Sequence, residues 1–513
     1  MKKRLFSMVL VIVLLLPILC SCGMGGSREN SLYPAVNFME KPVTITYMTI
    51  GDKPTNGRTE EVVERINKIL EKEINARLDI FYVSWTDYLE NYNRTLSEET
   101  VNIDLVGTGT DWLDAWKNVV NGNFLPMTEE MIRTYCPRTY ANVSSSQWEA
   151  CKYNGNIYFI PENEYEQWTN HGFIYRGDIA GQAGINSVET WEDLTNYFLY
   201  VRENYPDMIP WDASGDISVV ALGYLMSKTK YVPIYEITTY GIWGAYNNDL
   251  GTLRSPFYKG EELVEFARLM REWNQIGVFR SDNSVAGDNT EEFLQGITSV
   301  DQHHTQKYYT ETKPSLELSQ VGADAKFFWF GKESGNLLRT SILHGAMAVS
   351  ARSKNPEKAL MVYDYLRNDE TCYRLIRYGI EGTQYEINDE GMLEKPSGYN
   401  PDKDSITTNF WWGRRDALEI QDSGAAWEDY NELLKEYEQV AMDYPWDQYP
   451  FATADISERV DRINEVCAKY IPEIIYGNYR MSPEEEVAAF REDLRLAGYE
   501  LVTKELQKIL DSH

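Results

Sequence analysis

The stretch "VTITYMTI", residues 43–50, decides the fold class of this 513-residue chain. Apolar residues alternate with others at its start, which is the period of a β-strand: Val43, Ile45 and Tyr47. Thr59 then precedes a segment in which apolar residues recur at helical spacing, from Val62 to Leu70. A strand followed directly by an amphipathic helix is the first unit of an α/β fold.

The following segments repeat this unit. Alternation over 78–82 predicts a second strand, residues 88–96 a second helical face, and residues 103–106 a third strand. Strands that alternate with helices form a parallel sheet covered on both faces. Ligands of such sheets bind beyond the carboxyl ends of the strands, so the residues after each strand are the first candidates for a site.

The third predicted strand runs into Gly107-Thr108-Gly109-Thr110-Asp111-Trp112. Small residues there are expected to let the backbone approach a ligand, with Asp111 and Trp112 in the wall of a polar crevice. Alternatively, Asp111 caps a helix that continues through Trp116 and Val120, and the two interpretations are compatible. The segment is not a dinucleotide fingerprint, because G-x-G-x-x-G requires glycine at the position of Trp112.

Later segments predict a chain that crosses between two such units. Pro161 interrupts the apolar strand 157–160 and an extended pattern resumes at 173–175, so residues 161–172 are interpreted as a crossing. A second crossing is expected before residues 346–349. The strongest helix signal lies near the C-terminus, where an N-cap, a first-turn proline, a capping-box acid and a terminal glycine follow in order: Ser482, Pro483, Glu485 and Gly498.

The N-terminal segment has the architecture of a signal peptide. Three basic residues at 2–4 precede fifteen uncharged residues at 5–19, and the run contains Pro17. A membrane-spanning helix needs about 20 apolar residues. This run therefore suits a cleaved leader better than a permanent span, and no later segment is long and apolar enough to cross a bilayer.

The end of the leader, Leu19-Cys20-Ser21-Cys22, resembles the lipobox of bacterial lipoproteins. This resemblance implies a signal peptide at 1–21 and a lipid on Cys22, followed by a flexible linker over 22–40. The protein is then expected at the outer face of the cytoplasmic membrane, bound to the membrane through its lipid alone. The alternative is an ordinary signal peptide cut near Ser21.

Composition restricts the remaining function classes. The chain is 43% hydrophobic and 25% charged, as in ordinary globular proteins, and its length predicts more than one domain. A net charge of -30 without a basic cluster beyond the leader excludes nucleic acid as a partner. The cysteines beyond the leader have no zinc-like spacing; buried free thiols are favoured over a disulfide between Cys136 and Cys151.

Several segments together are similar to one family, the extracellular solute-binding lipoproteins of ABC importers, in particular the long group that includes LipO-like proteins and alginate-oligosaccharide binders. Besides the lipobox, they are "NGNFLPMTE" (121–129), "YNGNIYFIP" (153–161), "SVETWEDL" (187–194), "AVSARSKNPEKAL" (348–360), "GIEGTQYEI" (379–387) and "FREDLRLAGYELVTKELQKILD" (490–511). The resemblance implies an α/β, two-lobed, periplasmic-binding-protein-like type II fold with a hinge between the lobes. The expected lobes are 41–161 plus about 345–383, and 162–344 plus 384–513.

The resemblance also implies a function. The protein is expected to capture a carbohydrate, an oligosaccharide above all, between its lobes and to deliver it to the permease subunits of an ABC importer. A monomer, no cofactor and no catalysis are expected. The calcium loop of many longer members, D-x-N-x-N-G, is missing at 203–207, and the near match at 282–287 lacks two ligand positions, so no metal is expected.

Aromatic rings are expected to bind sugar faces, while carboxylates, amides and arginines bind the hydroxyls. Asp301 and His303 belong to a run expected to follow a strand at 297–300 and to present hydrogen-bonding groups at a crevice edge, or else to lie in an exposed loop. The neighbouring His303 and His304 would point to opposite faces and share no metal. The ligand-binding candidates are Trp85, Asp111, Trp112, Trp168, Trp243, Asp301, His303, Tyr385, Trp412 and Arg414.

Arg414 stands in the non-periodic stretch "NFWWGRRD", residues 409–416. It is expected to hold a sugar hydroxyl or a uronate; the alternative is a pair with a surface acid. Two rival functions remain, a receptor for peptides or another solute and a surface glycan-degrading enzyme. Glycosidases use two carboxylates, but among 79 acidic residues the sequence singles out no pair, and neither G-x-S-x-G nor H-E-x-x-H occurs.

Overall fold

The computed structural model describes residues 32–34, 36–98, 101–164, 170–213, 217–280, 289–447, 449, 451 and 453–512. The predicted signal peptide, Cys22, Trp168 and the polar loop 282–287 therefore lie outside the described residues. Of the helices in the described ranges, none combines the length and the apolar character that a bilayer crossing needs.

A five-stranded sheet forms the first half of the molecule, with the strand order β2-β1-β3-β13-β6. Its strands are β1 (Val43–Ile50), β2 (Ala76–Val83), β3 (Leu105–Thr108), β6 (Phe159–Pro161) and β13 (Ala346–Val349). β1 runs parallel to β2 and to β3, as predicted. β13 is antiparallel to both of its neighbours, because the chain returns from the second half of the molecule and enters the sheet from the opposite end.

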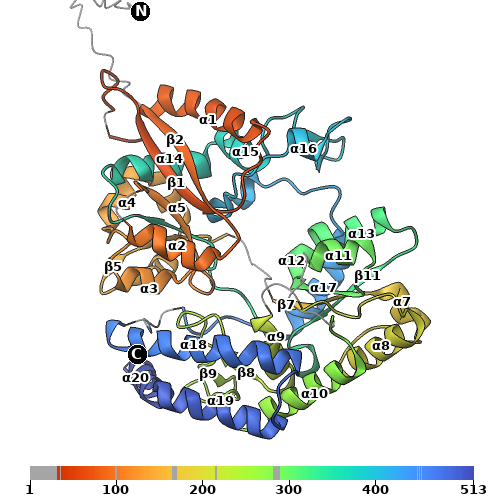
Figure 1. Cartoon of the computed structure of the whole chain (residues 1–513). Coiled ribbons are helices and arrows are strands. Elements are labelled where there is room, and N and C mark those ends of the chain that lie inside the picture. The colour runs from red at the N-terminus through yellow and green to blue at the C-terminus, as the bar shows by residue number, and fades with distance from the viewer. Residues whose placement is uncertain are drawn as a thin grey trace, which may run out of the picture.

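Helices surround this sheet on both faces (Figure 1). They are α1 (Arg58–Ile74), α2 (Tyr88–Ser97), α3 (Ala115–Val120), α4 (Glu129–Tyr135), α5 (Pro137–Asn142), α6 (Ser145–Ala150), α14 (Pro356–Asn368) and α15 (Glu370–Tyr378), with a small hairpin of β4 (Lys152–Tyr153) and β5 (Asn156–Ile157). The last four residues of β1 are all buried, as expected for a strand covered on both sides. We call the apolar cluster around this sheet the first core.

The second half is built on a three-stranded sheet with β7 (His171–Arg176) between β10 (Val300–His304) and β11 (Ala325–Trp329). Both neighbours run antiparallel to β7. The sequence predicted a second α/β unit here, and its sheet is antiparallel, unlike the three parallel strands of the first sheet. The strand expected at 297–300 begins at Val300 and includes the run 301–304 that was expected to follow it.

Alternate residues of β7 face two different apolar clusters. Phe173 and Tyr175 lie in the second core, and Ile174 lies in the third. The second core takes in α8 (Trp191–Asn204), α9 (Ser218–Lys228), α10 (Glu262–Ile276), α18 (Ala454–Tyr476), α19 (Pro483–Ala497) and α20 (Tyr499–Asp511), with the hairpin of β8 (Tyr231–Pro233) and β9 (Gly244–Tyr246). The third takes in α11 (Asn289–Gln295), a π-turn (Tyr308–Thr312), α13 (Lys313–Ser319) and α17 (Trp427–Val440).

The remaining elements are short. They are α7 (Gly177–Gln182), α12 (Thr305–Lys307), β12 (Leu337–Leu338) paired with β16 (Ala441–Met442), β14 (Glu386–Ile387) paired with β15 (Leu393–Glu394), α16 (Pro401–Asp404), and three 3-10 turns at Lys332–Ser334, Trp411–Gly413 and Asp416–Leu418. Cys136, Cys151, Cys372 and Cys467 are free and buried, as the sequence favoured.

Local capping signals mark the helix ends that the sequence predicted. The Oγ of Ser482 accepts a hydrogen bond from the Glu485 amide at 3.2 Å, and the Glu485 carboxylate accepts one from the Ser482 amide at 3.0 Å. Gly498 then ends α19 with a φ of 104°, a left-handed conformation that favours glycine. Thr190 and Asp193 cap α8 in the same reciprocal way.

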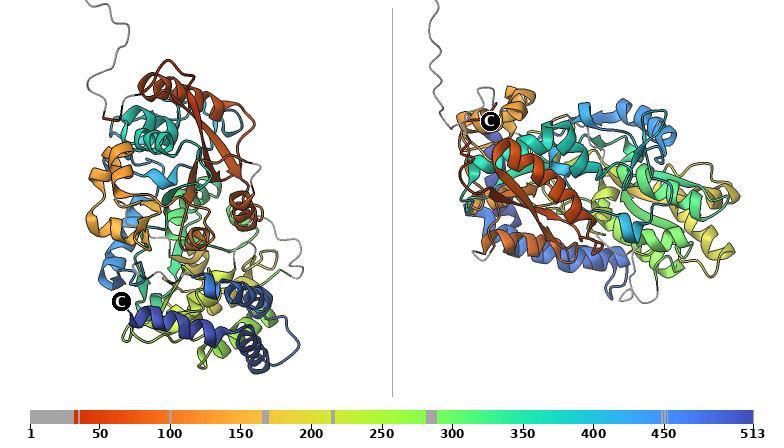
Figure 2. Two further views of the ribbon diagram at one scale, coloured as in Figure 1. Left: turned by 90° about the vertical axis from the view of Figure 1, so that its left-hand side faces the viewer. Right: turned by 90° about the horizontal axis from the view of Figure 1, so that it is seen from above.

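One segment packs differently from the expected division into lobes. Phe410 and Trp412, expected in the second lobe, are buried in the first core. The Tyr47 hydroxyl also donates a hydrogen bond to the backbone oxygen of Asn409 at 2.8 Å. We therefore place this segment with the first sheet; the other predicted lobe boundaries stay predictions. Figures 1 and 2 show the two halves of the molecule. The first half is the five-stranded sheet with its helices, and the second half includes the C-terminal helices α18 to α20.

An ion pair joins the halves where α3 and α18 meet. The Lys117 Nζ lies 2.7 Å from the Asp461 Oδ1, and the two side chains are 38% and 50% exposed. Exposed pairs of this kind contribute at most about 1 kcal/mol. The pair therefore adjusts the contact between the halves without fixing it.

Reversing the charge of Lys117 is expected to weaken this contact. Lys117→Glu places a third carboxylate beside Asp461 and Asp114, so we expect a larger radius of gyration by small-angle X-ray scattering in low salt. An Asp461→Lys substitution added to Lys117→Glu restores the attraction and should return the wild-type radius. Identical scattering from all three proteins would show that the pair does not act on the arrangement of the halves.

Candidate ligand-binding site

Aromatic rings gather beyond the carboxyl ends of β2 and β3. We call this group the tryptophan cluster; its members are Trp85, Tyr88, Trp112, Trp411 and Trp412. The centroids of Trp112 and Trp412 are 5.6 Å apart with ring planes at 13°, and Trp85 stacks on Trp112 at 6.4 Å and 20°. Trp412 is fully buried, whereas Trp85 is 46% exposed. The stack thus runs from the first core outwards through the half-buried Trp112 and ends on the exposed ring of Trp85.

Two glycines of β3 and its extension make room for this stack. A Cβ atom at Gly107 would lie 2.2 Å from the Trp412 ring, and one at Gly109 would lie 2.4 Å from the Trp112 Nε1. The sequence predicted that these small residues let a ligand approach the backbone. In the structure the indole rings occupy that space, so the glycines position the rings.

Asp111 lies beside the cluster and forms a pair with His344. The Asp111 Oδ2 is 2.8 Å from the His344 Nδ1, and the Trp112 Nε1 donates to the His344 backbone oxygen at 2.9 Å. Burial lowers the pKa of His344, but the charges of Asp111 and Glu162 outweigh it, so the pKa is raised overall. Asp111 does not cap a helix, because α3 begins after Asp114.

Carboxyl groups of the second half lie opposite Asp111. The Tyr444 hydroxyl donates to the Glu236 Oε2 at 2.6 Å and accepts from the Tyr235 amide at 3.0 Å. Burial first, and then the charges of Asp447 and Asp111, raise the pKa of Glu236 to about 8. Burial also raises the pKa of Asp447 to about 6, and the charge of Asp111 adds to it. Acids of both halves therefore act on one another.

A loop between β12 and β13 links these acids. The Ser341 side chain in this loop lowers the pKa of Asp447, and the His344 Nδ1 is paired with Asp111. Glu162, directly after β6, donates its amide hydrogen to the oxygens of Ile342 and Gly345. Burial raises the pKa of Glu162 to about 7, although the charges of His344 and three arginines lower it. We call Asp111, Glu162, Glu236 and Asp447 the acid cluster.

Four predicted ligand-binding residues are packed inside the protein: Trp412, in the first core, and Trp243, Asp301 and Tyr385. Trp243 is fully buried and stacks on Tyr499 at 5.3 Å and 4°, deep in the second core. Asp301 is held by Asn289 and Thr290, and its burial raises its pKa to about 6. Tyr385 is buried against Tyr378. None of these residues exposes a surface to a ligand in this arrangement, so the structure does not support their predicted role, which stays a prediction.

The paired histidines also differ from the prediction. The ring centroids of His303 and His304 are 4.3 Å apart, and the His303 Nδ1 accepts a hydrogen bond from the His304 amide at 2.9 Å, so the two rings lie together at the end of β10. The His303 ring stacks on His171 at 6.1 Å. Burial lowers the pKa of His303 to about 2, so the ring is neutral. Within the described residues, no group of histidine, cysteine or acidic side chains has an arrangement suited to a metal ion.

Arg414 follows the alternative that the sequence left open. Its Nε lies 2.8 Å from the Asp416 Oδ1, and a second nitrogen lies 3.6 Å from Glu419. Its neighbour Arg415 pairs with Glu164. Both guanidinium groups are therefore engaged by acids. Of the predicted ligand-binding residues, Trp168 lies outside the described residues.

Sequence reasoning missed about half of the site. Glu162 could have been found, because it directly follows the predicted strand that ends at Pro161. Glu236, Tyr444 and Asp447 carry no comparable signal. Tyr444 and Glu236 are 208 residues apart in the chain, and only the packing of the second core brings them together.

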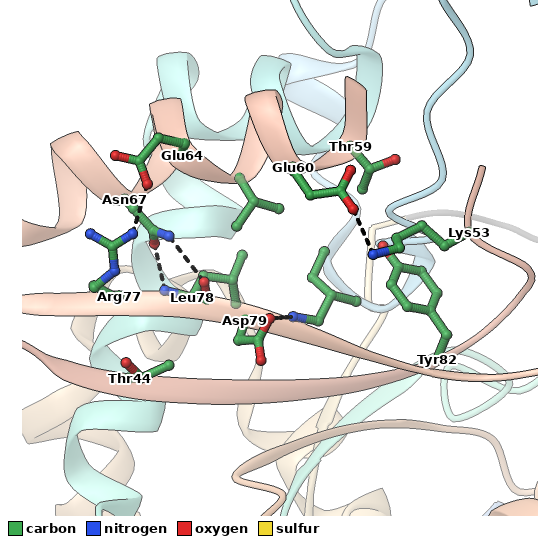
Figure 3. A pocket seen from close by; sticks show the side chains of 12 residues that line it. Thr44, Lys53, Thr59, Glu60, Glu64, Asn67, Arg77, Leu78, Asp79 and Tyr82 are labelled. Atoms are coloured by element: carbon green, nitrogen blue, oxygen red, sulfur yellow. Dashed lines mark hydrogen bonds and ion pairs between the residues drawn. The ribbon is translucent and has the colours of Figure 1, made fainter. Parts of the chain in front are cut away.

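A separate pocket of about 290 Å³ lies between α1 and the edge strand β2 (Figure 3). Its charged side chains form pairs, with the Lys53 Nζ 2.7 Å from Glu60 and an Arg77 nitrogen 2.7 Å from Glu64. This pocket does not include the tryptophan cluster or the acid cluster. Its two cations are paired with Glu60 and Glu64, and Asp79 is the remaining charged group of its lining.

Comparisons with known proteins place this site in context. Residues 445–513 match a family model described as a domain of unknown function, DUF3502. A protein of Streptococcus pneumoniae serotype 4, named a carbohydrate ABC transporter substrate-binding protein, is 22% identical to this chain and covers 99% of it and 98% of its own length.

Solved structures agree over almost the whole chain. The N-glycan transport solute-binding protein NgtS of S. pneumoniae, in complex with Man1GlcNAc, matches with a TM-score of 0.67 at 19% identity, over 92% of this chain and 99% of its own. The alginate-binding protein AlgQ2 without calcium ion matches with 0.65 at 16%, over the same shares. A human-milk-oligosaccharide (HMO) binding protein of Bifidobacterium longum infantis matches with 0.61 at 15%, again over 92% and 99%.

These structures show that the fold is the two-lobed α/β fold of solute-binding proteins, as the sequence predicted. The full-length relative narrows the class, because it is a substrate-binding protein of a carbohydrate ABC transporter. The predicted resemblance to the extracellular solute-binding proteins of ABC importers is thereby confirmed.

Proposed function

We propose that this protein is the substrate-binding component of an ABC importer, and that it captures an oligosaccharide between its two lobes and delivers it to the permease. The stack of Trp85, Trp112 and Trp411 next to the acid cluster carries the proposal. Exposed rings suit the C–H faces of sugars, and carboxyl groups suit their hydroxyls. The sugars named in the structures of NgtS and AlgQ2 support the same ligand class.

Binding is proposed to be the whole reaction. A ligand that contacts both lobes favours the closed arrangement by its higher affinity for that state, and the permease then recognises the closed form. The relatives are named as binding components of transporters, which supports a protein that returns its ligand unchanged. The ligand-binding roles of Trp85, Asp111 and Trp112 are part of this proposal.

Attachment to the membrane is proposed to occur through Cys22. The lipobox pattern supports a diacylglyceryl group on this thiol, and the polar stretch after it supports a flexible tether. Two acyl chains give stable anchoring, whereas one gives only reversible binding. The folded lobes would then stand at the extracytoplasmic face as a monomer beside the permease.

Ligand screening tests this function. Saccharide libraries are expected to raise the melting temperature of the purified protein, because a ligand at 100 times its Kd adds about 2.7 kcal/mol of stability. Mass spectrometry after overnight incubation should recover the saccharide intact. Stabilisation by peptides alone would identify a peptide receptor, and shortened saccharides would identify an enzyme.

A further inference from the structure

The charges around the tryptophan cluster are strongly one-sided. Each half contributes two carboxyl groups to the acid cluster, Asp111 and Glu162 from the first and Glu236 and Asp447 from the second. One loop lies beside acids of both halves: it carries His344, which is paired with Asp111 at 2.8 Å, and Ser341, whose side chain lowers the pKa of Asp447. A ligand that reaches Trp112 therefore lies within the field of several carboxyl groups.

The cations in this region are already engaged. His344 is paired with Asp111, and Arg377 and Arg414 both lie against Glu419. The fully buried Arg367 binds the Pro161 oxygen and the Asn163 side chain. Recognition of a sugar carboxylate needs a guanidinium or ammonium group that faces it, ideally as a bidentate pair. Each of these guanidinium groups makes at least one contact within the protein, although the buried Nε of Arg367 makes no hydrogen bond within the described residues.

Two carboxylate oxygens of the acid cluster lack a partner. The Oδ1 atoms of Asp111 and Asp447 are buried and make no hydrogen bond within the described residues. Buried acceptors of this kind are costly to leave unsatisfied, so they favour a donor from outside. A sugar hydroxyl is such a donor, whereas a ligand carboxylate is an acceptor and repels them.

We propose that the acid cluster makes the site selective for neutral oligosaccharides and excludes oligosaccharides that contain uronate. This inference rests on the proposed function, because it assumes a saccharide ligand. Hydroxyls of a neutral sugar satisfy Asp111 and Asp447 while its faces pack on the tryptophan cluster. A uronate would bring a further negative charge into a site whose cations are engaged.

Matched probes test the proposal directly. Titration calorimetry at pH 7.5 compares neutral gluco-, manno-, xylo- and chito-oligosaccharides of three to six sugars with oligomannuronate and oligogalacturonate, and compares the latter with its methyl ester. We expect at least one neutral probe to bind about 30-fold more tightly than any uronate probe, a factor that corresponds to about 2 kcal/mol. The methyl ester should bind more tightly than the free acid.

A charge-neutral variant tests the residue that the proposal names. Asp447→Asn is expected to reduce the ratio between the Kd of the uronate probes and the Kd of the neutral probes about tenfold. Asp389→Asn, in the exposed turn between β14 and β15, removes the same charge elsewhere and should leave the difference unchanged. Urea denaturation of both variants checks that they fold.

The outcomes separate the two proposals. Uronate probes that bind as tightly as neutral ones would overturn the selectivity and leave an oligosaccharide receptor standing. A protein that binds none of these saccharides but responds to peptides would overturn both. An unchanged difference in a folded Asp447→Asn variant would show that its carboxylate does not select the ligand.

Discussion

A protein in which Trp112 is replaced by alanine is expected to bind its oligosaccharide about 30- to 100-fold more weakly, a loss of about 2 to 3 kcal/mol typical of an aromatic anchor. Trp112 is the ring on which both Trp85 and Trp412 stack, and its Nε1 holds the loop that carries His344. Its removal therefore takes away one sugar-binding face and leaves the Trp85 ring, a second such face, without the ring on which it stacks. Titration calorimetry with the best saccharide from the screen measures the effect.

Trp427 supplies the matched control. It is also partly exposed, its Nε1 donates to a backbone oxygen, that of Asp422, and its ring packs on Tyr309 and Tyr430 in the third core. Trp427→Ala removes a comparable ring away from the site and should leave affinity within twofold. An equal loss of affinity in both variants would mean that general destabilisation of the protein, and not the loss of a binding face, weakens saccharide binding.

Much of the first sheet could be predicted because its signals are local. The alternation at 43–50 and the helical spacing after Thr59 correspond to β1 and α1. Reciprocal side-chain caps lie within four residues, so Ser482 marked the start of α19 correctly, and Thr190 carries the same local signal at the start of α8. Signals of this range need no knowledge of the tertiary fold.

Strand direction and strand length depended on distant segments. β13 is antiparallel to β3 because the chain between them builds the whole second sheet, and no local pattern records that path. β10 continues through Asp301 and His303 because β7 pairs with them there. Polar residues were expected to end this strand, but a sheet partner extends it.

The residues of the candidate site also fall into those that local sequence signals indicate and those that depend on distant segments. Asp111 and Trp112 follow directly on β3, so the strand-end rule found them, whereas Trp85, which follows β2, was predicted as an aromatic residue suited to a sugar face. Trp243 was predicted in the site because it stands in a loop-like segment between Gly241 and Gly244, whereas its packing partner Tyr499 comes from the C-terminal helices. Burial of an aromatic residue is decided by partners that its own segment does not contain.

Glutamine in place of Glu236 is expected to remove a large pH dependence of stability. The pKa of Glu236 is raised from 4.5 to about 8 in the folded protein, first by burial and then by the charges of Asp447 and Asp111. A carboxyl group with a raised folded pKa stabilises the fold fully below the unfolded pKa, and this contribution is lost as the pH rises towards 8. For Glu236 the loss between pH 4.5 and 8 is about 4 kcal/mol.

The glutamine side chain of this variant cannot ionise, and its amide oxygen can still accept the Tyr444 hydroxyl hydrogen. Glu236→Gln should therefore match the wild type near pH 5 and exceed its free energy of unfolding by a few kcal/mol at pH 8, as urea denaturation at several pH values would show. Glu438→Gln, an exposed change on α17, should keep the wild-type pH profile. If the Glu236→Gln and wild-type profiles run parallel, Glu236 is hydrated in solution, which requires the two halves to stand further apart than they do here.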